Sequence, residues 1–452
     1  MNLPNYFLAD LPPEAHVNAA LITEACQTLK RNRAHYLETR PTSQILRTLE
    51  KVGREWLSPE SPFRQYALQA APAATSFSAE ALAHGLDLFF QQLTVDNLEA
   101  LLRQEIGHPM RLDDFRAAGE EMAERRVAWA RGPQLLAHIA PGNIPSATLA
   151  QMVMGLLARS AQFVKCASDQ SFLPRLFAHS IYEAEAKLGA CLEVAEWKGG
   201  AENLEEALFA ESDCIVVTGS DETLKEVRRR APLSSRLIGY GTKVSFGYIS
   251  RQALEKQSKA TVQEAARSIA AWDQRGCLSP HDIYVEESHA GSAEFFATDL
   301  AEELATLEST LPRGLLSARD AAAIASRRAF YEVRAAHSLE TKMWASSEST
   351  AWTVILENDP RFQASCQNRF IYIKAVPNLD AALQGAEPIR DQISTVGLAC
   401  GPDEKTELAR RFSRWGALRI CPLGEMQNPP LAWRHDGRPV LAELLTWCDW
   451  EK

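Results

Sequence analysis

The stretch AWDQRGCLSP, residues 271–280, carries the most information in this 452-residue chain. It places Cys277 directly after a glycine, between a run of helical spacing over residues 261–272 and a strand-like run over residues 281–286. A thiol at such a junction is held by a rigid scaffold and stays accessible, as a nucleophile must. The common alternative is a buried structural cysteine, because a free cysteine packs as a small hydrophobic side chain.

Outward from this stretch, short strand-like runs alternate with longer helical runs. Before Cys277 the pattern predicts strands over 135–140, 161–166, 191–197, 214–217 and 243–249, and helices over 146–159, 172–188, 203–210 and 222–230. After Cys277 it predicts strands over 351–356, 369–374, 393–399 and 418–421, and helices over 290–308, 318–334 and 404–415. Such alternation is typical of doubly wound parallel sheets, so the predicted fold class is α/β.

The N-terminal region is different, because residues 1 to about 130 show helical spacing almost throughout, including the Glu- and Arg-rich segment 113–129. We therefore predict three parts. Residues 1–250 contain the helical region and a first α/β domain that binds a cofactor. Residues 251–420 form a second, catalytic α/β domain with the cysteine, and residues 421–452 form a C-terminal tail.

Composition excludes several function classes. The formal net charge of −10 argues against a nucleic-acid or anionic-membrane binder. The nine cysteines include no C-x-x-C pair, which disfavours a zinc ribbon and a thioredoxin-type motif, so no metal site is predicted. Their odd number and wide spacing argue against a disulfide scaffold and for a reducing compartment. The first 20 residues contain Asp10 and Glu14 and lack the core of a signal peptide, and no run of about 18 apolar residues follows. The expected location is the cytoplasm.

Three polar motifs follow predicted strands. Pro141-Gly142-Asn143 comes after the first strand, where Asn143 could donate a hydrogen bond to a developing oxyanion or could simply be a turn residue. Lys165 ends the next strand and could reach a ribose or phosphate, although a surface lysine is the commoner case. Gly219 and Ser220 form a phosphate-compatible turn after a third strand. No G-x-G-x-x-G fingerprint is present, which disfavours an ordinary dinucleotide-binding dehydrogenase.

The order of these motifs resembles that of the aldehyde dehydrogenase superfamily: a proline–asparagine turn, a strand-end lysine, a glycine–serine turn, a glycine-rich segment and then the cysteine. Within it, the chain is most similar to the acyl reductase branch typified by LuxC, the fatty acyl reductase of bacterial bioluminescence. The resemblance covers the chain from about residue 130 onward. It is carried by residues 138–145, 239–246, 272–280, 422–426 and 433–437.

The resemblance implies an aldehyde-dehydrogenase-like fold and a homo-oligomer. Cys277 would take the acyl group as a thioester, and Asn143 with the backbone N–H of Cys277 would form the oxyanion hole. Lys165 would contact the adenosine ribose of a nicotinamide cofactor. The turn at Gly219 and Ser220 would lie against the cofactor diphosphate, beside the segment from Gly239 to Gly241.

Two departures from the aldehyde-oxidising pattern favour reduction. Where hydrolytic members carry a glutamate base in Glu-Leu-Gly-Gly, this chain has Gly239-Tyr240-Gly241-Thr242, so no carboxylate activates water against the thioester. Where NAD-preferring members often have a glutamate three residues after the lysine, this chain has Ser168, which removes repulsion of a 2′-phosphate and favours NADPH, although Asp169 is adjacent. A third departure is the absence, over residues 365–369, of the glutamate that holds the nicotinamide ribose in ordinary members.

The sequence therefore predicts NADPH-dependent reduction of a fatty acyl group, by resemblance a long-chain one, to the aldehyde. The acyl group would arrive on CoA, on an acyl carrier or from an acyl synthetase. One alternative is an acyl-phosphate reductase of the glutamyl-phosphate type, which shares the fold and the cysteine. The other is a non-catalytic scaffold or acyl-transfer subunit, which need not bind NADPH.

Overall fold

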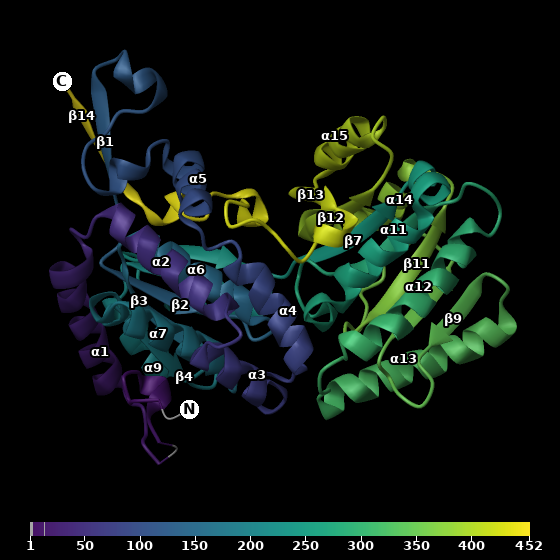
Figure 1. Ribbon diagram of the computed structural model, residues 1–452, viewed down its shortest axis with the longest axis horizontal. Coiled ribbons are helices and arrows are strands. Elements are labelled where there is room, and N and C mark those ends of the chain that lie inside the picture. Colours follow the sequence, from purple (N-terminus) through teal and green to yellow (C-terminus); the bar gives the residue numbers. More distant parts are fainter. Residues whose placement is uncertain (1–2, 13) are drawn as a thin grey trace. The chain divides into compact units, whose positions relative to one another are not determined.

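The computed structural model describes residues 3–12 and 14–452 and divides them into two compact units. Unit 1 comprises the chain up to residue 70 with residues 86–241 and 430–452, and unit 2 comprises residues 71–85 and 242–429. Each unit therefore includes segments that are distant in sequence (Figure 1). The predicted parts 1–250, 251–420 and 421–452 stay a prediction about domains.

The centre of unit 1 is a five-stranded parallel sheet with the strand order β4-β3-β2-β5-β6. Its strands are β2 (Leu135–Ile139), β3 (Ala161–Cys166), β4 (Leu192–Glu196), β5 (Cys214–Thr218) and β6 (Arg236–Tyr240). The connecting helices are α6 (Pro145–Leu157), α7 (Phe172–Ala184), α8 (Ala186–Gly189), α9 (Glu202–Glu211) and α10 (Asp221–Arg230). The strand order reverses between β2 and β5, and ligands of such sheets bind at the carboxyl ends of the strands beside this point.

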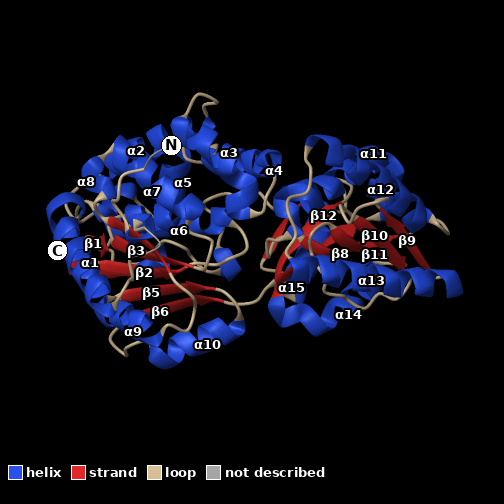
Figure 2. Ribbon diagram, turned by 90° about the horizontal axis from the view of Figure 1, so that it is seen from below, coloured by secondary structure: helices blue, strands red, loops and turns tan. Residues whose placement is uncertain are grey.

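The helical N-terminal region consists of α1 (Ala19–Asn32), α2 (Thr42–Leu57), α3 (Pro62–Thr75), α4 (Ala79–Phe90) and α5 (Val95–Ile106). One face of the unit 1 sheet is covered by α1, α9 and α10, and the other by α6 and α7, on which α2 packs in turn (Figure 2). The buried side chains of α1, including Ile22 and Leu29, pack directly on this sheet. The expected helical region is thus part of the packing that supports the sheet.

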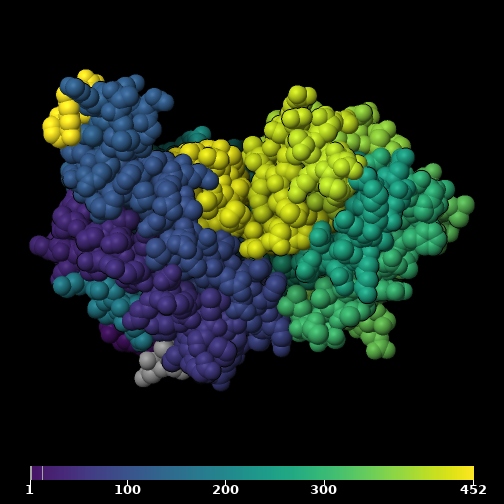
Figure 3. Space-filling model, turned by 45° about the horizontal axis from the view of Figure 1, so that its top comes forward, coloured from purple at the N-terminus to yellow at the C-terminus, as the bar shows by residue number. Residues whose placement is uncertain are grey.

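The helix predicted over residues 113–129 is wrong. The segment instead contains one short 3-10 turn, Gly119–Met122, and the start of the strand β1 (Arg126–Arg131), which pairs antiparallel with the last strand, β14 (Thr446–Glu451). Gly119 and Arg125 have φ of +56° and +55°, which interrupts a right-handed helix on the N-terminal side of the strand. In Figure 3 the yellow end of the chain lies against the blue surface of β1.

Unit 2 contains a seven-stranded sheet with the order β13-β12-β7-β8-β11-β10-β9, in which only β9 runs antiparallel to its neighbour. Its strands are β7 (Val244–Ile249), β8 (Pro280–Glu286), β9 (Thr341–Ala345), β10 (Thr353–Glu357), β11 (Phe370–Val376), β12 (Ile393–Ala399) and β13 (Arg419–Pro422). Its helices are α11 (Arg251–Ala270), α12 (Ser292–Thr310), α13 (Ala318–His337), α14 (Leu379–Ala386) and α15 (Lys405–Trp415).

The helices α11 and α12 cover one face of the unit 2 sheet, and α13, α14 and α15 cover the other (Figure 2). Both faces are therefore buried, which explains why its central strands read as nearly continuous apolar runs. The prediction of an α/β fold with two doubly wound, mostly parallel sheets and a helical N-terminal region is confirmed. No helix in the described part of the chain has the length and apolar character needed to cross a membrane.

Candidate active site

Cys277 lies in the loop that joins α11 to β8 in unit 2, as the sequence predicted. The Cys277 residue is half-buried, and its backbone carbonyl accepts a hydrogen bond from Ser245 Oγ at 2.8 Å. The Ser245 hydroxyl oxygen itself accepts the N–H of Thr395 on β12, at 3.2 Å. The backbone of the cysteine is thus tied to two central strands of the sheet.

The far side of the cysteine loop is held by the segment that follows β13. Gln427 donates through Nε2 to Ser279 Oγ, and the Ser279 N–H donates to the carbonyl of Gly276 at 3.0 Å. A Cβ on Gly276 would lie only 2.7 Å from Gln427 Nε2. Any larger residue before the cysteine would therefore displace the amide end of the Gln427 side chain, which passes close to the backbone there.

Three consecutive residues ahead of the cysteine, Trp272, Asp273 and Gln274, have left-handed backbone conformations with φ of 51°, 50° and 61°. This conformation costs about 1–2 kcal/mol for each residue that has a Cβ. The Trp272 ring is buried and packs edge-on against Phe77, with ring centroids 5.3 Å apart. It also lies directly against Gly85, where a Cβ would be 2.2 Å from the indole.

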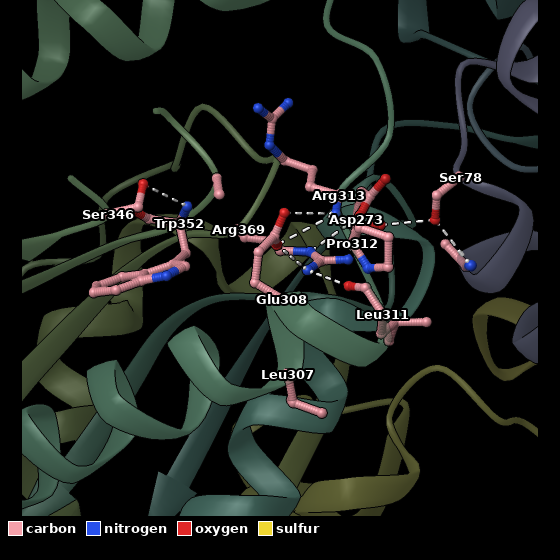
Figure 4. A network of polar contacts seen from close by, with 12 residues as sticks. Ser78, Asp273, Leu307, Glu308, Leu311, Pro312, Arg313, Ser346, Trp352 and Arg369 are labelled. Atoms are coloured by element: carbon pink, nitrogen blue, oxygen red, sulfur yellow. Dashed lines mark hydrogen bonds and ion pairs between the residues drawn. The ribbon is translucent and has the colours of Figure 1, made fainter. Parts of the chain in front are cut away.

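A buried ion pair is centred on the same turn (Figure 4). Arg369 donates to Asp273 Oδ1 through Nε at 3.0 Å and Nη2 at 2.7 Å, and the two side chains are 1% and 3% exposed. Through Nη1 it also donates to Glu308 Oε2 at 2.9 Å and to the Leu311 carbonyl at 2.8 Å. Burial of such charges is costly unless their hydrogen bonds are complete, and here each nitrogen of the guanidinium has a partner.

Most of the other thiols of the chain are poor candidates for a nucleophile. Burial raises the pKa of seven of the other eight cysteines, to about 12 for Cys26, Cys166, Cys191 and Cys214, and to about 11 for Cys366, Cys400 and Cys421. These seven thiols remain protonated at neutral pH and are poor nucleophiles. Arg419, on β13, lies within electrostatic range of Cys277; burial lowers the pKa of its guanidinium, against the attraction of Cys421, Glu425 and Cys277.

The other predicted site residues belong to unit 1, where they gather at the carboxyl edge of the parallel sheet. Asn143 lies in the turn between β2 and α6 and is partly buried. Gly219 and Ser220 follow β5, and Ser220 Oγ caps α10 by accepting the N–H of Thr223 at 3.3 Å. The Gly219 N–H donates to the carbonyl of Tyr240 at 3.1 Å, so this turn is joined to the end of β6.

Gly239 and Gly241 lie at the end of β6, beside α10. A Cβ on Gly241 would be 2.5 Å from Asp221 Oδ1, and a Cβ on Gly239 would be 2.9 Å from Leu224 Cδ2. The intervening Tyr240 stacks on His435 at 4.2 Å between ring centroids. Arg438 covers the Tyr240 ring at 4.6 Å and donates to the Gly239 carbonyl at 2.7 Å. The 433–437 segment was part of the family resemblance, but the sequence did not identify its contact with β6.

Lys165 ends β3 with its side chain buried and its ammonium 5.9 Å from the centre of the Trp197 ring. Burial lowers the pKa of Lys165, against the attraction of Glu205 and Glu196. An anionic or hydroxyl-bearing ligand beside this ammonium would compensate for its lost hydration. The residues at this sheet edge therefore fit the sugar and phosphates of a dinucleotide, with Gly219 allowing close approach of the backbone.

Ser168 is exposed in the loop that follows β3, and the next residues of this loop are held by a carboxylate that the sequence did not reveal. Glu196, at the end of β4, accepts the N–H of Asp169 at 2.7 Å and of Ser171 at 3.1 Å. Because β3 and β4 pair in register at Cys166 and Glu196, the end of β4 is adjacent to this loop. The sequence could have revealed this role of Glu196 only if the register between β3 and β4 had been known.

The structure thus brings Asn143 and the six predicted cofactor residues to one edge of one sheet, while Cys277 belongs to the other unit. In the segment 365–369, where ordinary aldehyde dehydrogenases were expected to place a ribose-binding glutamate, Arg369 instead turns into unit 2 and pairs with Asp273. Among the described residues, no group of three or more His, Cys, Asp or Glu side chains could hold a metal ion.

Proteins of known structure share this fold. Two solved structures match nearly the whole chain. An NAD-dependent benzaldehyde dehydrogenase of Corynebacterium glutamicum has a TM-score of 0.71 and 12% identity, and the match covers 99% of this chain and 94% of that one. Aldehyde dehydrogenase C of Pseudomonas syringae, solved with NAD+ and octanal, has a TM-score of 0.70 and 14% identity, and the match covers 97% of this chain and 90% of that one. The predicted aldehyde-dehydrogenase-like fold is confirmed.

Two curated relatives are acyl reductases by name. A long-chain acyl-protein thioester reductase of Aliivibrio fischeri is 21% identical over 91% of this chain and 82% of its own length. Long-chain acyl-protein thioester reductase 2 of Photobacterium leiognathi is 22% identical over 70% of this chain, which spans 63% of that protein. The sequence profile of the acyl-CoA reductase (LuxC) family matches residues 37–447, and the chain therefore belongs to this family.

Proposed function

We propose that this chain reduces a thioester-bound fatty acyl group to the aldehyde, with Cys277 as the acyl acceptor. The observation that carries the proposal is the setting of Cys277: it is half-buried, its backbone is fixed on both sides, and it lies near a buried arginine. Burial keeps thiols such as those of Cys26 and Cys166 protonated, which makes them poor nucleophiles. Family membership supports the same reaction class.

The acyl-transfer step follows from thiol chemistry. The Cys277 thiolate adds to the carbonyl carbon of the incoming thioester, and the electron pair of the C=O bond moves to oxygen. Collapse of this tetrahedral oxyanion re-forms the C=O bond and expels the donor thiolate, which takes up a proton. The product is an acyl thioester on Cys277.

Asn143 and the backbone N–H of Cys277 are proposed to hold the oxyanion, as the resemblance implies. An amide N–H positioned at such an oxygen typically contributes about 10²–10³-fold to the rate when it is compared with a variant lacking it. Asn143 lies in a turn between β2 and α6, a junction that presents polar groups at the sheet's carboxyl edge.

A nicotinamide cofactor, proposed here as NADPH, supplies the hydride that reduces the thioester. Lys165 and Ser168 would contact the adenosine ribose and its 2′-phosphate, while Gly219, Ser220, Gly239 and Gly241 would line the rest of the cofactor's path. Ser168 supports NADPH because it places no carboxylate at that position. Asp169 and Glu196 are acidic neighbours, so the preference depends on Glu196 staying bound to the backbone of the loop.

Protection from water is the proposed reason for glycine at position 239. Without a carboxylate there, nothing at that position removes a proton from an attacking water, and the thioester survives until it is reduced. The Leu224 side chain occupies the space into which a side chain at position 239 would begin to extend.

The acyl donor is proposed to be either acyl-CoA or an acyl group on a partner protein, because the family profile names the former and the relatives' names the latter. Incubation of the enzyme with NADPH and each long-chain donor, with aldehyde measured by mass spectrometry, tests the proposal. Aldehyde formation that disappears in Cys277→Ala is expected. A wild-type enzyme that neither binds NADPH nor forms aldehyde from either donor would instead support the scaffold alternative.

A further inference from the structure

Two runs of strained backbone meet beside the cysteine loop. Residues 272–274 and 367–369 each have three consecutive non-glycine residues with positive φ, and together they make up six of the twelve such residues among those the structure describes. Left-handed residues usually occur singly, because every Cβ in that conformation approaches the following carbonyl oxygen. A run of three persists only when the surrounding structure holds it.

One ion pair joins the two runs, since Asp273 belongs to the first and Arg369 to the second. The second carboxylate oxygen, Asp273 Oδ2, accepts the N–H of Gly314 at 3.0 Å. Both side chains are therefore fully engaged in the interior of unit 2, as Figure 4 shows.

Gln274 adds a second link between the same segments. Its Nε2 donates to the Pro280 carbonyl at 2.7 Å and to the Phe370 carbonyl at 2.9 Å. The first contact closes the cysteine loop on its own end, and the second fastens it to the residue that follows the 367–369 run. Cys277 thus lies midway along a loop whose two ends are joined through Gln274, which is itself bonded to the first residue of β11.

We propose that the Asp273–Arg369 ion pair is a positioning device for the nucleophile, holding the left-handed turn that orients Cys277 for acyl transfer. The inference rests on the proposed role of Cys277. Neither side chain touches the reacting atoms in this scheme. The segment 365–369, which lacks the ribose-binding glutamate expected in ordinary relatives, instead supports the cysteine loop.

The test compares Asp273→Asn with a matched control in the same unit. Asp273→Asn keeps the size of the side chain but removes the charge that Arg369 compensates. The control is Glu357→Gln, which neutralises an acid that is equally buried and paired with Lys374 at 3.0 Å, and whose contacts lie outside the cysteine loop. Arg369→Lys and Arg369→Met complete the set, because lysine retains the cation but not the forked geometry.

Two measurements are made well below each variant's unfolding temperature. Single-turnover acylation by a long-chain acyl-CoA, followed by intact mass, gives the maximal rate constant and the half-saturating concentration. Hydrogen exchange of a peptide covering residues 271–281 reports on the loop without requiring any reaction; it includes the Arg275 amide, which donates to the Trp272 carbonyl at 2.9 Å.

For Asp273→Asn we expect the maximal acylation rate constant to fall about 10–100-fold with little change in half-saturation, because small displacements of a reacting group cost this much. Loop exchange should accelerate, Arg369→Lys should lose less rate than Arg369→Met, and Glu357→Gln should change the rate less than twofold. The proposal is overturned if Asp273→Asn acylates within twofold of wild type, if loop exchange is unchanged, or if Glu357→Gln is equally slow. Failure of the wild type to be acylated at Cys277 would refute the proposed function instead, and loop exchange would still test the ion pair.

Discussion

Restoring a carboxylate at position 239 should convert the enzyme partly into a thioesterase. The Gly239→Glu substitution is feasible for the backbone, because Gly239 lies in extended conformation within β6. Its Cβ would lie 2.9 Å from Leu224 Cδ2 and 3.3 Å from Leu224 Cγ, so the leucine tip must move. Such overpacking typically costs about 1–3 kcal/mol, which most domains tolerate.

The rate of hydrolysis should rise measurably in the variant, which remains folded despite its loss of stability. A positioned general base contributes about 10²–10⁴-fold, so even a poorly placed glutamate should accelerate hydrolysis of the acyl-enzyme visibly. The assay follows decay of preformed acyl-Cys277 in the absence of NADPH, by intact mass. Gly239→Gln is the matched control, because it has the same size and no base, and Leu224→Ala combined with Gly239→Glu relieves the overlap.

A glutamate variant that binds NADPH normally yet deacylates no faster than the glutamine control would refute the reasoning. It would show that Gly239 does not occupy the place of the catalytic glutamate. Faster loss of the acyl group in both variants would point to general loosening of the site and would contradict the base mechanism as well.

Three further substitutions test other parts of the account. Ser168→Glu should shift the ratio of kcat/KM for NADPH over NADH towards NADH by about tenfold or more, since a charge-assisted contact to a phosphate contributes roughly 1.5–3 kcal/mol; an unchanged ratio would remove Ser168 from the site. Between pH 5 and 8, Asp282→Asn should become increasingly stable relative to wild type. Burial raises the pKa of Asp282 from 3.8 to about 8, so the folded wild type loses stability relative to its unfolded chain as pH rises through that window. Denaturant titrations that give the same stability difference between variant and wild type at every pH would contradict this. Gly85→Ala should lower the free energy of unfolding by about 1–3 kcal/mol, because its Cβ would overlap the Trp272 ring, and urea titration measures this loss.

Much of the architecture was predictable from the sequence because the strands of both sheets are buried on two faces. Their short apolar runs, such as 161–166 and 393–399, coincide with β3 and β12. The strands that escaped prediction are at edges or pair across long separations. The β9 strand is an edge with half-buried side chains, and β1 is stabilised by pairing with β14, more than 300 residues later.

The residues of the candidate site also fall into those that the sequence identifies and those that it does not. Cys277, Lys165 and the glycine–serine turn lie at the ends of predicted strands or helices, so local pattern and family resemblance name them as candidates. Arg369 and Glu196 could not be found in this way, because each acts on a distant segment: Arg369 binds a residue 96 positions earlier, and Glu196 binds backbone amides 25 and 27 positions earlier. Their roles depend on strand register and on left-handed turns, which a single sequence does not specify.

The most direct test of the central claim is a chase of the isolated acyl-enzyme. Wild type and Cys277→Ala are incubated with a long-chain acyl-CoA or acyl-protein, freed of excess donor, digested to locate the acyl group, and in parallel mixed with NADPH while aldehyde is measured. The account predicts one acyl group on the Cys277 peptide of the wild type, stoichiometric conversion of that group to aldehyde on adding NADPH, and neither in the variant. An acyl group on another cysteine, or aldehyde formation by Cys277→Ala at a rate near that of the wild type, would contradict it.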